Sequence, residues 1–99
     1  MWATASANVE IRDSTLTGNF AAVTADSGAV VTIDNSLLTH NVGGIASNGV
    51  GTVRISNTTV ADNTIGMQTN NGGIIVSFVN NRIYGNGTNG APTQSVFQK

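Results

Sequence analysis

The segments VTIDNSLLTHN (residues 31–41) and VRISNTTVADN (residues 53–63) carry the same order of apolar, polar and asparagine positions, and they start 22 residues apart. Related segments start at Val9 (VEIRDSTLTGN) and at Val76 (VSFVNNRIYGN), so the chain contains four copies of one unit. The last interval is 23 residues, and we place its extra residue in the turn at residues 70–73, where an insertion costs little. Repeats with a period of roughly 20 to 50 residues indicate a stacked architecture.

Apolar and polar residues alternate within each unit, as they do around Val53, Ile55 and Val60. This alternation is the period of a half-buried β-strand. A third, weaker strand lies around Ile45, and Asn-Gly dipeptides mark the turns. Crossovers between parallel strands of one sheet are nearly always right-handed. The sequence therefore predicts an all-β, single-stranded right-handed parallel β-helix of about four 22-residue coils with three short strands each.

Equivalent residues of successive coils stack into columns, so the core can be written from the alignment. The expected apolar columns are Val9, Val31, Val53 and Val76; Ile11, Ile33, Ile55 and Phe78; Leu16, Leu38, Val60 and Ile83; and Val23, Ile45 and Met67. We expect one domain, 1–99, with an incomplete first coil (1–8), coils at 9–30, 31–52, 53–75 and 76–92, and a capping tail at 93–99. In that tail Val96 and Phe97 are expected to cover the last coil, because solenoids need terminal caps.

Two further columns are polar and nearly uniform. One contains Asn19, Asn41, Asn63 and Asn86, and the other contains Asp13, Asn35, Asn57 and Asn80. Both fall where the strands must bend, where an amide can bond to backbone groups freed by the turn and to the identical amide one coil away. We interpret both columns as structural ladders. The alternative, a polar ligand site, requires amides that face solvent.

The repeated pattern x-I-x-N-S/T-x-L/V-x-x-N, followed by a turn that contains glycine, resembles the pectate-lyase-like right-handed β-helix superfamily, particularly its NosD-like and polysaccharide-processing bacterial repeats. The resemblance runs from Val9 to Asn86. It implies the fold and leaves the activity open, because one fold hosts many functions. It also implies a secreted or periplasmic bacterial location, although the opening MWATASANVE lacks the features of a signal peptide.

Composition and charge limit the kinds of partner and cofactor that we expect for this chain. Charged residues are 9% of the chain, the net charge is -1 and there is no cysteine, so we expect no nucleic acid, no membrane and no thiolate metal site. Calcium wants roughly six to eight oxygen ligands, whereas the five carboxylates are dispersed, and we expect no metal and no cofactor. His40 and Asp62 share one turn column, and we expect an exposed pair without a nucleophile.

Four charged residues, Glu10, Arg12, Asp34 and Arg54, should point outward from the first strand of their coils because they alternate with apolar residues. They are the candidate residues of a carbohydrate site, since the resemblance includes polysaccharide-processing proteins. However, we expect the two arginines to keep both carboxylates ionised, and no long loop is present to build a cleft around them. We therefore assign no catalytic residue and expect a solvated charged face.

The function expected from these features is a non-enzymatic β-solenoid module with a structural or interaction role, such as a fragment or engineered truncation of a longer β-helix. The alternative is a carbohydrate-binding or polysaccharide-processing protein of the lyase or hydrolase type. Met1 aligns with Val23, and residues 1–8 are too short to cover the first coil. Since an open coil offers unpaired strand groups, we expect a homodimer through this edge, with Trp2 near the seam; polysaccharide is the other partner considered.

Overall fold

The computed structural model describes residues 1–78 and 80–96. Within them the chain forms short β-strands and no helix. The strands are β1 (Trp2–Ala3), β2 (Asn8–Arg12), β3 (Thr15–Thr17), β4 (Ala21–Ala25), β5 (Val30–Asp34), β6 (Leu37–Thr39), β7 (Gly43–Asn48), β8 (Thr52–Ser56), β9 (Thr59–Ala61), β10 (Ile65–Asn70), β11 (Ile74–Phe78), β12 (Arg82–Tyr84) and β13 (Gln94–Val96).

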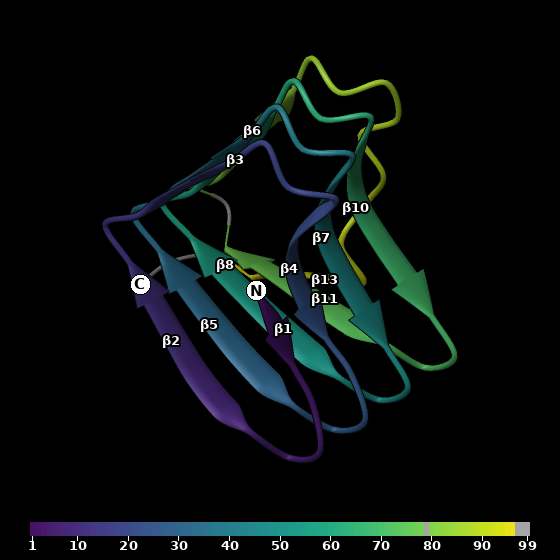
Figure 1. Ribbon diagram of the computed structural model, residues 1–99. Helices are drawn as coiled ribbons and strands as arrows, with labels where there is room; N and C mark the ends of the chain where they lie inside the picture. Colours follow the sequence, from purple (N-terminus) through teal and green to yellow (C-terminus); the bar gives the residue numbers. More distant parts are fainter. Residues whose placement is uncertain (79, 97–99) are drawn as a thin grey trace.

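Three parallel sheets run along the stack of coils (Figure 1). Sheet A has the order β1-β4-β7-β10, sheet B has the order β13-β11-β8-β5-β2, and sheet C has the order β12-β9-β6-β3. The chain visits the sheets in turn, so each full coil gives one strand to each sheet. The predicted all-β solenoid with three strands per coil is therefore confirmed.

The core lies between the three sheets and is built from the apolar columns. Val31 and Ile33 of β5 pair in register with Val53 and Ile55 of β8, and all four side chains are fully buried. The column of Leu38 and Val60 and the column of Val23 and Ile45 have the predicted partners as well. Stacking thus places like side chains against one another through the first three coils.

The fourth coil departs from the predicted columns. Val53 pairs with Ile75 and Ile55 pairs with Ser77, so Val76 and Phe78 are not the core residues of β11. The turn at residues 70–73 has the same length as its equivalent one coil earlier, and the extra residue lies between Ser77 and Arg82 instead.

Glycine occupies the same place at the end of the turn at residues 70–73 and of the equivalent turn one coil earlier. A Cβ atom on Gly51 would lie 2.6 Å from the carbonyl oxygen of Ala25, and one on Gly73 would lie 1.8 Å from that of Ser47. These two glycines therefore make the same close approach to the preceding coil, and the strands that follow them pair 22 residues apart.

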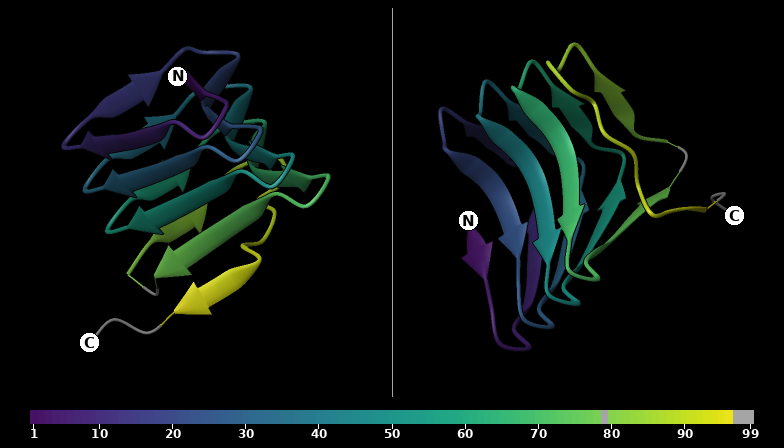
Figure 2. Two further views of the ribbon diagram at one scale, coloured as in Figure 1. Left: turned by 90° about the horizontal axis from the view of Figure 1, so that it is seen from below. Right: turned by 90° about the vertical axis from the view of Figure 1, so that its right-hand side faces the viewer.

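The two ends of the stack differ (Figure 2). At the start, β1 is two residues long and covers part of sheet A only, which leaves β2 and β3 at the edges of sheets B and C. At the other end the tail adds β13 to sheet B, where Phe78 pairs with the backbone of Val96. The predicted side-chain contacts of Val96 and Phe97 lie outside the part of the chain that the structure describes.

Candidate functional site

The inner asparagines of the first ladder are buried and fully bonded. Asn63 Oδ1 accepts the backbone N–H of Asn41 at 2.9 Å and its Nδ2 at 3.0 Å. Asn63 Nδ2 in turn donates to Leu38 O at 3.1 Å and to Asn86 Oδ1 at 2.9 Å. Asn41 and Asn63 are each 3% exposed. These amides hold the bends of successive coils together and have no free donor for a ligand.

The loop after the last rung ends this ladder within the chain. Asn86 donates to Asn89 Oδ1 from its backbone nitrogen at 3.3 Å and from Nδ2 at 3.0 Å, the same pair of bonds that each earlier asparagine makes to the next coil. Asn89 thus occupies the place of the following rung. Sequence reasoning missed it because Asn89 lies three residues after Asn86, outside the 22-residue spacing.

The second polar column faces solvent. Asn35 Nδ2 donates to Asp13 Oδ1 at 2.6 Å, Asn57 Nδ2 donates to Asn35 Oδ1 at 3.3 Å, and the Asn57 N–H donates to Asn80 Oδ1 at 2.9 Å. Asp13, Asn35 and Asn57 have φ angles of 50°, 49° and 50°. Asn and Asp tolerate this left-handed conformation better than other residues with side chains, so backbone geometry accounts for their recurrence.

A third polar column lies beside the second and was not predicted. Ser14, Ser36 and Thr58 each donate their hydroxyl to the carbonyl two residues earlier, and Asn81 takes the equivalent place in the fourth coil. Ser14 N–H also donates to Ser36 Oγ at 3.3 Å, and Thr58 N–H donates to Asn81 Oδ1 at 2.8 Å. Because this column mixes Ser, Thr and Asn, it lacks the uniform residue type that marks the asparagine ladders.

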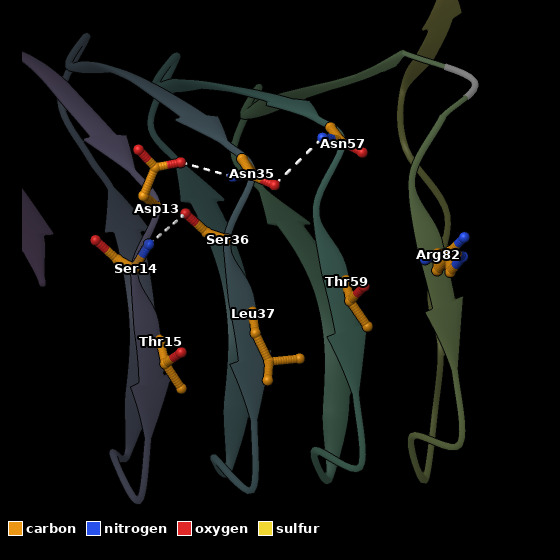
Figure 3. A pocket seen from close by; sticks show the side chains of 9 residues that line it. All are labelled: Asp13, Ser14, Thr15, Asn35, Ser36, Leu37, Asn57, Thr59 and Arg82. Atoms are coloured by element: carbon orange, nitrogen blue, oxygen red, sulfur yellow. Dashed lines mark hydrogen bonds between the residues drawn. The ribbon is translucent and has the colours of Figure 1, made fainter.

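The two outer polar columns and the outer face of sheet C line an open hollow of about 420 Å³ (Figure 3). Its walls are formed by Asp13, Ser14, Thr15, Asn35, Ser36, Leu37, Asn57, Thr59 and Arg82. Figure 3 shows Asp13 at the first coil and Arg82 at the last, with the neutral side chains between them. The described residues form no group of three potential metal ligands. The hollow is therefore a shallow polar surface that offers hydrogen bonds along its length.

The candidate carbohydrate residues lie on the outer face of sheet B. Arg12 is in register with Asp34, and Glu10 and Arg54 each pair with Thr32, from opposite sides. The Arg12 side chain makes an ion pair with Glu10 of its own strand, and both side chains are more than half exposed. This face therefore holds two acids and two bases on three adjacent strands.

A family model described as a right handed beta helix region matches residues 1–97. The chain belongs to the right-handed β-helix family. No curated protein and no solved structure matches it significantly. The part of this β-helix that the structure describes contains no helix with the length and apolar character of a membrane span.

His40 and Asp62 of this β-helix occupy equivalent places in successive coils, in the turn that leads from sheet C to sheet A. Both residues have positive φ angles, 57° and 56°, and both line a hollow of about 500 Å³. His40 Nδ1 lies 3.0 Å from Thr39 Oγ1. The histidine is therefore engaged with its neighbour in the same coil.

Sheet A of the β-helix has an apolar outer strip that sequence reasoning did not single out. Phe20 and Val42 are 83% and 47% exposed, and they line a groove of about 260 Å³ together with Ala21, Thr24, Gly43, Ala46, Asn48, Ile65, Gln68 and Asn70. Trp2 is 70% exposed and lies beside Thr24. The three outer faces therefore differ: sheet A carries an apolar strip beside polar side chains, sheet B is charged and sheet C is polar.

Proposed function

We propose that this right-handed β-helix is a non-enzymatic module that acts by association, and that a second copy of the chain binds to its open first coil. The observation that carries the proposal is a difference in burial between two consecutive coils. Val9, Ile11 and Leu16 are half-buried, whereas their stacking partners Val31, Ile33 and Leu38 are 0% exposed. Covering the first coil would remove this apolar surface from water, which is favourable.

The backbone at the same edge supports this proposal. The carbonyl of Asp34 accepts two hydrogen bonds, one from Ser36 Oγ at 2.8 Å and one from the N–H of Asp13 in the preceding coil at 3.2 Å. Arg12 is the equivalent residue of the first coil, and its carbonyl accepts the hydroxyl of Ser14 in the same way. The side of this carbonyl that would accept a backbone N–H from a preceding coil faces the open end of the stack. Edge groups of this kind are a template for another strand.

The distribution of ionisable side chains also favours an association module over an enzyme. Glu10 is engaged by Arg12, and Asp13 accepts a ladder amide. Asp26 accepts the N–H of Ser27 at 2.8 Å within an exposed turn. These carboxylates lie in different columns and turns, whereas acid–base chemistry requires groups that converge on one substrate position.

Sedimentation velocity of the 99-residue chain tests the proposal. We expect a species of twice the chain mass of 10.1 kDa at micromolar concentration. Ile11→Lys, which places a charge on the edge of the first coil, should yield the monomer, whereas Thr17→Lys on the exposed face of β3 should not. Circular dichroism establishes that both variants are folded. A parent chain that sediments as a monomer overturns the proposal.

The charged face of sheet B favours a second candidate function, the binding or processing of an acidic polysaccharide. Arg12 and Arg54 are exposed on it, and guanidinium groups pair well with carboxylates. Titration with a panel of acidic polysaccharides, compared with Arg12→Ala and Arg54→Ala, tests binding by this face. A lyase or hydrolase assay with and without calcium tests processing, and turnover would contradict the non-enzymatic proposal.

A further inference from the structure

The free edge of sheet B belongs to β2, which lies at one side of the sheet in Figure 1. The carbonyl of Ala7 accepts the N–H of Val30, and the N–H of Asp13 donates to Asp34. Because backbone groups alternate in direction along a strand, the odd-numbered residues of β2 bond toward β5. The N–H and C=O groups of Glu10 and Arg12 therefore point to the open side.

The side chains of the same two residues carry opposite charges. Glu10 and Arg12 both lie on the outer face of β2, where they form an ion pair with each other. Ile11, between them, faces the interior and is half-buried. A strand with this order of charges is complementary to its own copy when the copy runs in the opposite direction.

We propose that two chains pair through antiparallel β2 strands about a two-fold axis at Ile11, so that Glu10 lies opposite the partner's Arg12 and Arg12 lies opposite the partner's Glu10. This inference rests on the proposed association through the first coil and specifies its geometry. The backbone N–H and C=O groups of Glu10 and Arg12 point to the open side. In this register they exchange hydrogen bonds with those of the partner's Arg12 and Glu10, which are the hydrogen-bonded pairs of an antiparallel ladder. Ile11 and the partner's Ile11 form the pair between them and close the core across the seam.

Charge selects this register over its nearest alternative. An axis at Glu10 would also keep Val9 and Ile11 on the interior side, but it would set Glu10 directly opposite the partner's Glu10. Like charges directly opposite each other destabilise a strand pair, whereas opposite charges stabilise it. An axis at Ile11 instead forms two ion pairs across the interface.

The same axis determines what lies over the other two sheets. A two-fold axis that reverses β2 exchanges sheets A and C between the two chains, so β1 of one chain approaches β3 of its partner. Trp2, the single tryptophan, is 70% exposed in the isolated chain and lies on β1. Its fluorescence emission should therefore shift to shorter wavelength as the chain concentration rises.

Charge reversal tests the register. Glu10→Lys and Arg12→Glu should each weaken self-association by about tenfold or more, because each places like charges opposite one another. An equimolar mixture of the two variants should associate as tightly as the parent, since every cross-strand pair is again of opposite sign. Arg54→Glu is the matched control, because it reverses a charge on the same face two strands away from the edge, and it should leave the dimer intact.

A cysteine cross-link tests the axis independently of charge. The chain has no cysteine, and opposed residues of a non-hydrogen-bonded antiparallel pair have Cα atoms about 4.5 Å apart, within the range of a disulfide. Ile11→Cys should therefore form a disulfide-linked dimer under mild oxidation, and Glu10→Cys should form much less.

The outcomes separate this inference from the proposed function. A monomeric parent overturns both. A dimeric parent that keeps its affinity in both charge variants, or that cross-links through Glu10→Cys and not through Ile11→Cys, overturns the antiparallel register while association through the first coil stands. Recovery of binding only in the mixture, together with cross-linking at position 11, is the expected result.

Discussion

Asn63 shows at the residue scale why asparagine recurs at one bend of every coil. Its side chain accepts two hydrogen bonds from Asn41, donates one to Leu38 O and donates one to Asn86. The same side chain therefore satisfies two backbone groups of the preceding coil and bonds to the asparagine side chains of the coils on both sides. A hydroxyl has a single donor hydrogen and an ionised carboxylate has none, so neither can make the two donated and two accepted bonds of this amide.

Asn63→Leu is expected to lower the free energy of unfolding by about 1 to 3 kcal/mol more than Thr17→Ala, because it leaves buried polar groups of the neighbouring coils without partners. Asn41→Leu should behave in the same way, since Asn41 and Asn63 are buried whereas Thr17 is exposed. Urea denaturation of the three variants measures the difference. Equal midpoints for Asn63→Leu and Thr17→Ala would show that the buried amides do not stabilise the stack.

The strands show at the element scale which parts of the fold follow from the sequence. β3, β6 and β9 each hold a single interior position flanked by outward ones, so their column was predicted correctly. β11 begins with Ile74, Ile75 and Val76, and three apolar residues in a row allow two registers. The register depends on close backbone contacts of Gly73 and on an extra residue before β12, and neither leaves a hydrophobic pattern.

The sequence likewise predicted one part of the candidate site and missed another. Alternation along β2, β5 and β8 was enough to place Glu10, Arg12, Asp34 and Arg54 on one face, because side-chain direction in a strand has a period of two. The ion pair within β2 could not be predicted, since Arg12 has Glu10 in its own strand and Asp34 in the next as competing acids. The hydroxyl column was missed because it mixes residue types.

Deletion of residues 94–99 is expected to destabilise the protein and promote aggregation. β13 pairs with β11, and Thr93 Oγ1 accepts the N–H of Ile75 at 2.9 Å just before it. Without the tail, β11 becomes an unprotected edge strand, which is a template for other chains. Thermal unfolding and light scattering measure the two effects. A truncated chain with the parent's midpoint and scattering would show that β13 does not protect the last coil.

The molecule as a whole behaves as a one-dimensional stack, because each coil contacts only the coils beside it. The stability of such a protein is approximately a sum of coil terms and interface terms. The interior coils are close to equivalent, with Val31, Ile33 and Leu38 in one and Val53, Ile55 and Val60 in the next, all 0% exposed. In the 99-residue chain β2 and β3 of the first coil have a neighbouring strand on one side only, and the proposed association covers their free side.

Insertion of a second copy of residues 31–52 after Thr52 should therefore raise the stability of the chain. Val30 and Thr52 are register partners, so Val31 can follow Thr52 as it follows Val30. The added coil buries its apolar residues completely and adds one rung to the asparagine ladder. Even about 1 kcal/mol of net gain would raise the thermal midpoint by roughly 4 °C or more.

The matched control for this insertion is a copy of residues 31–51. It is one residue shorter, and a shift of one residue turns every side chain of a strand to the opposite face. We expect the shorter insertion to lower the midpoint, while the 22-residue insertion raises it and leaves self-association unchanged, since the first coil is untouched. Equal losses of stability for the two insertions would show that the coils are not interchangeable units and that the stack depends on features particular to each one.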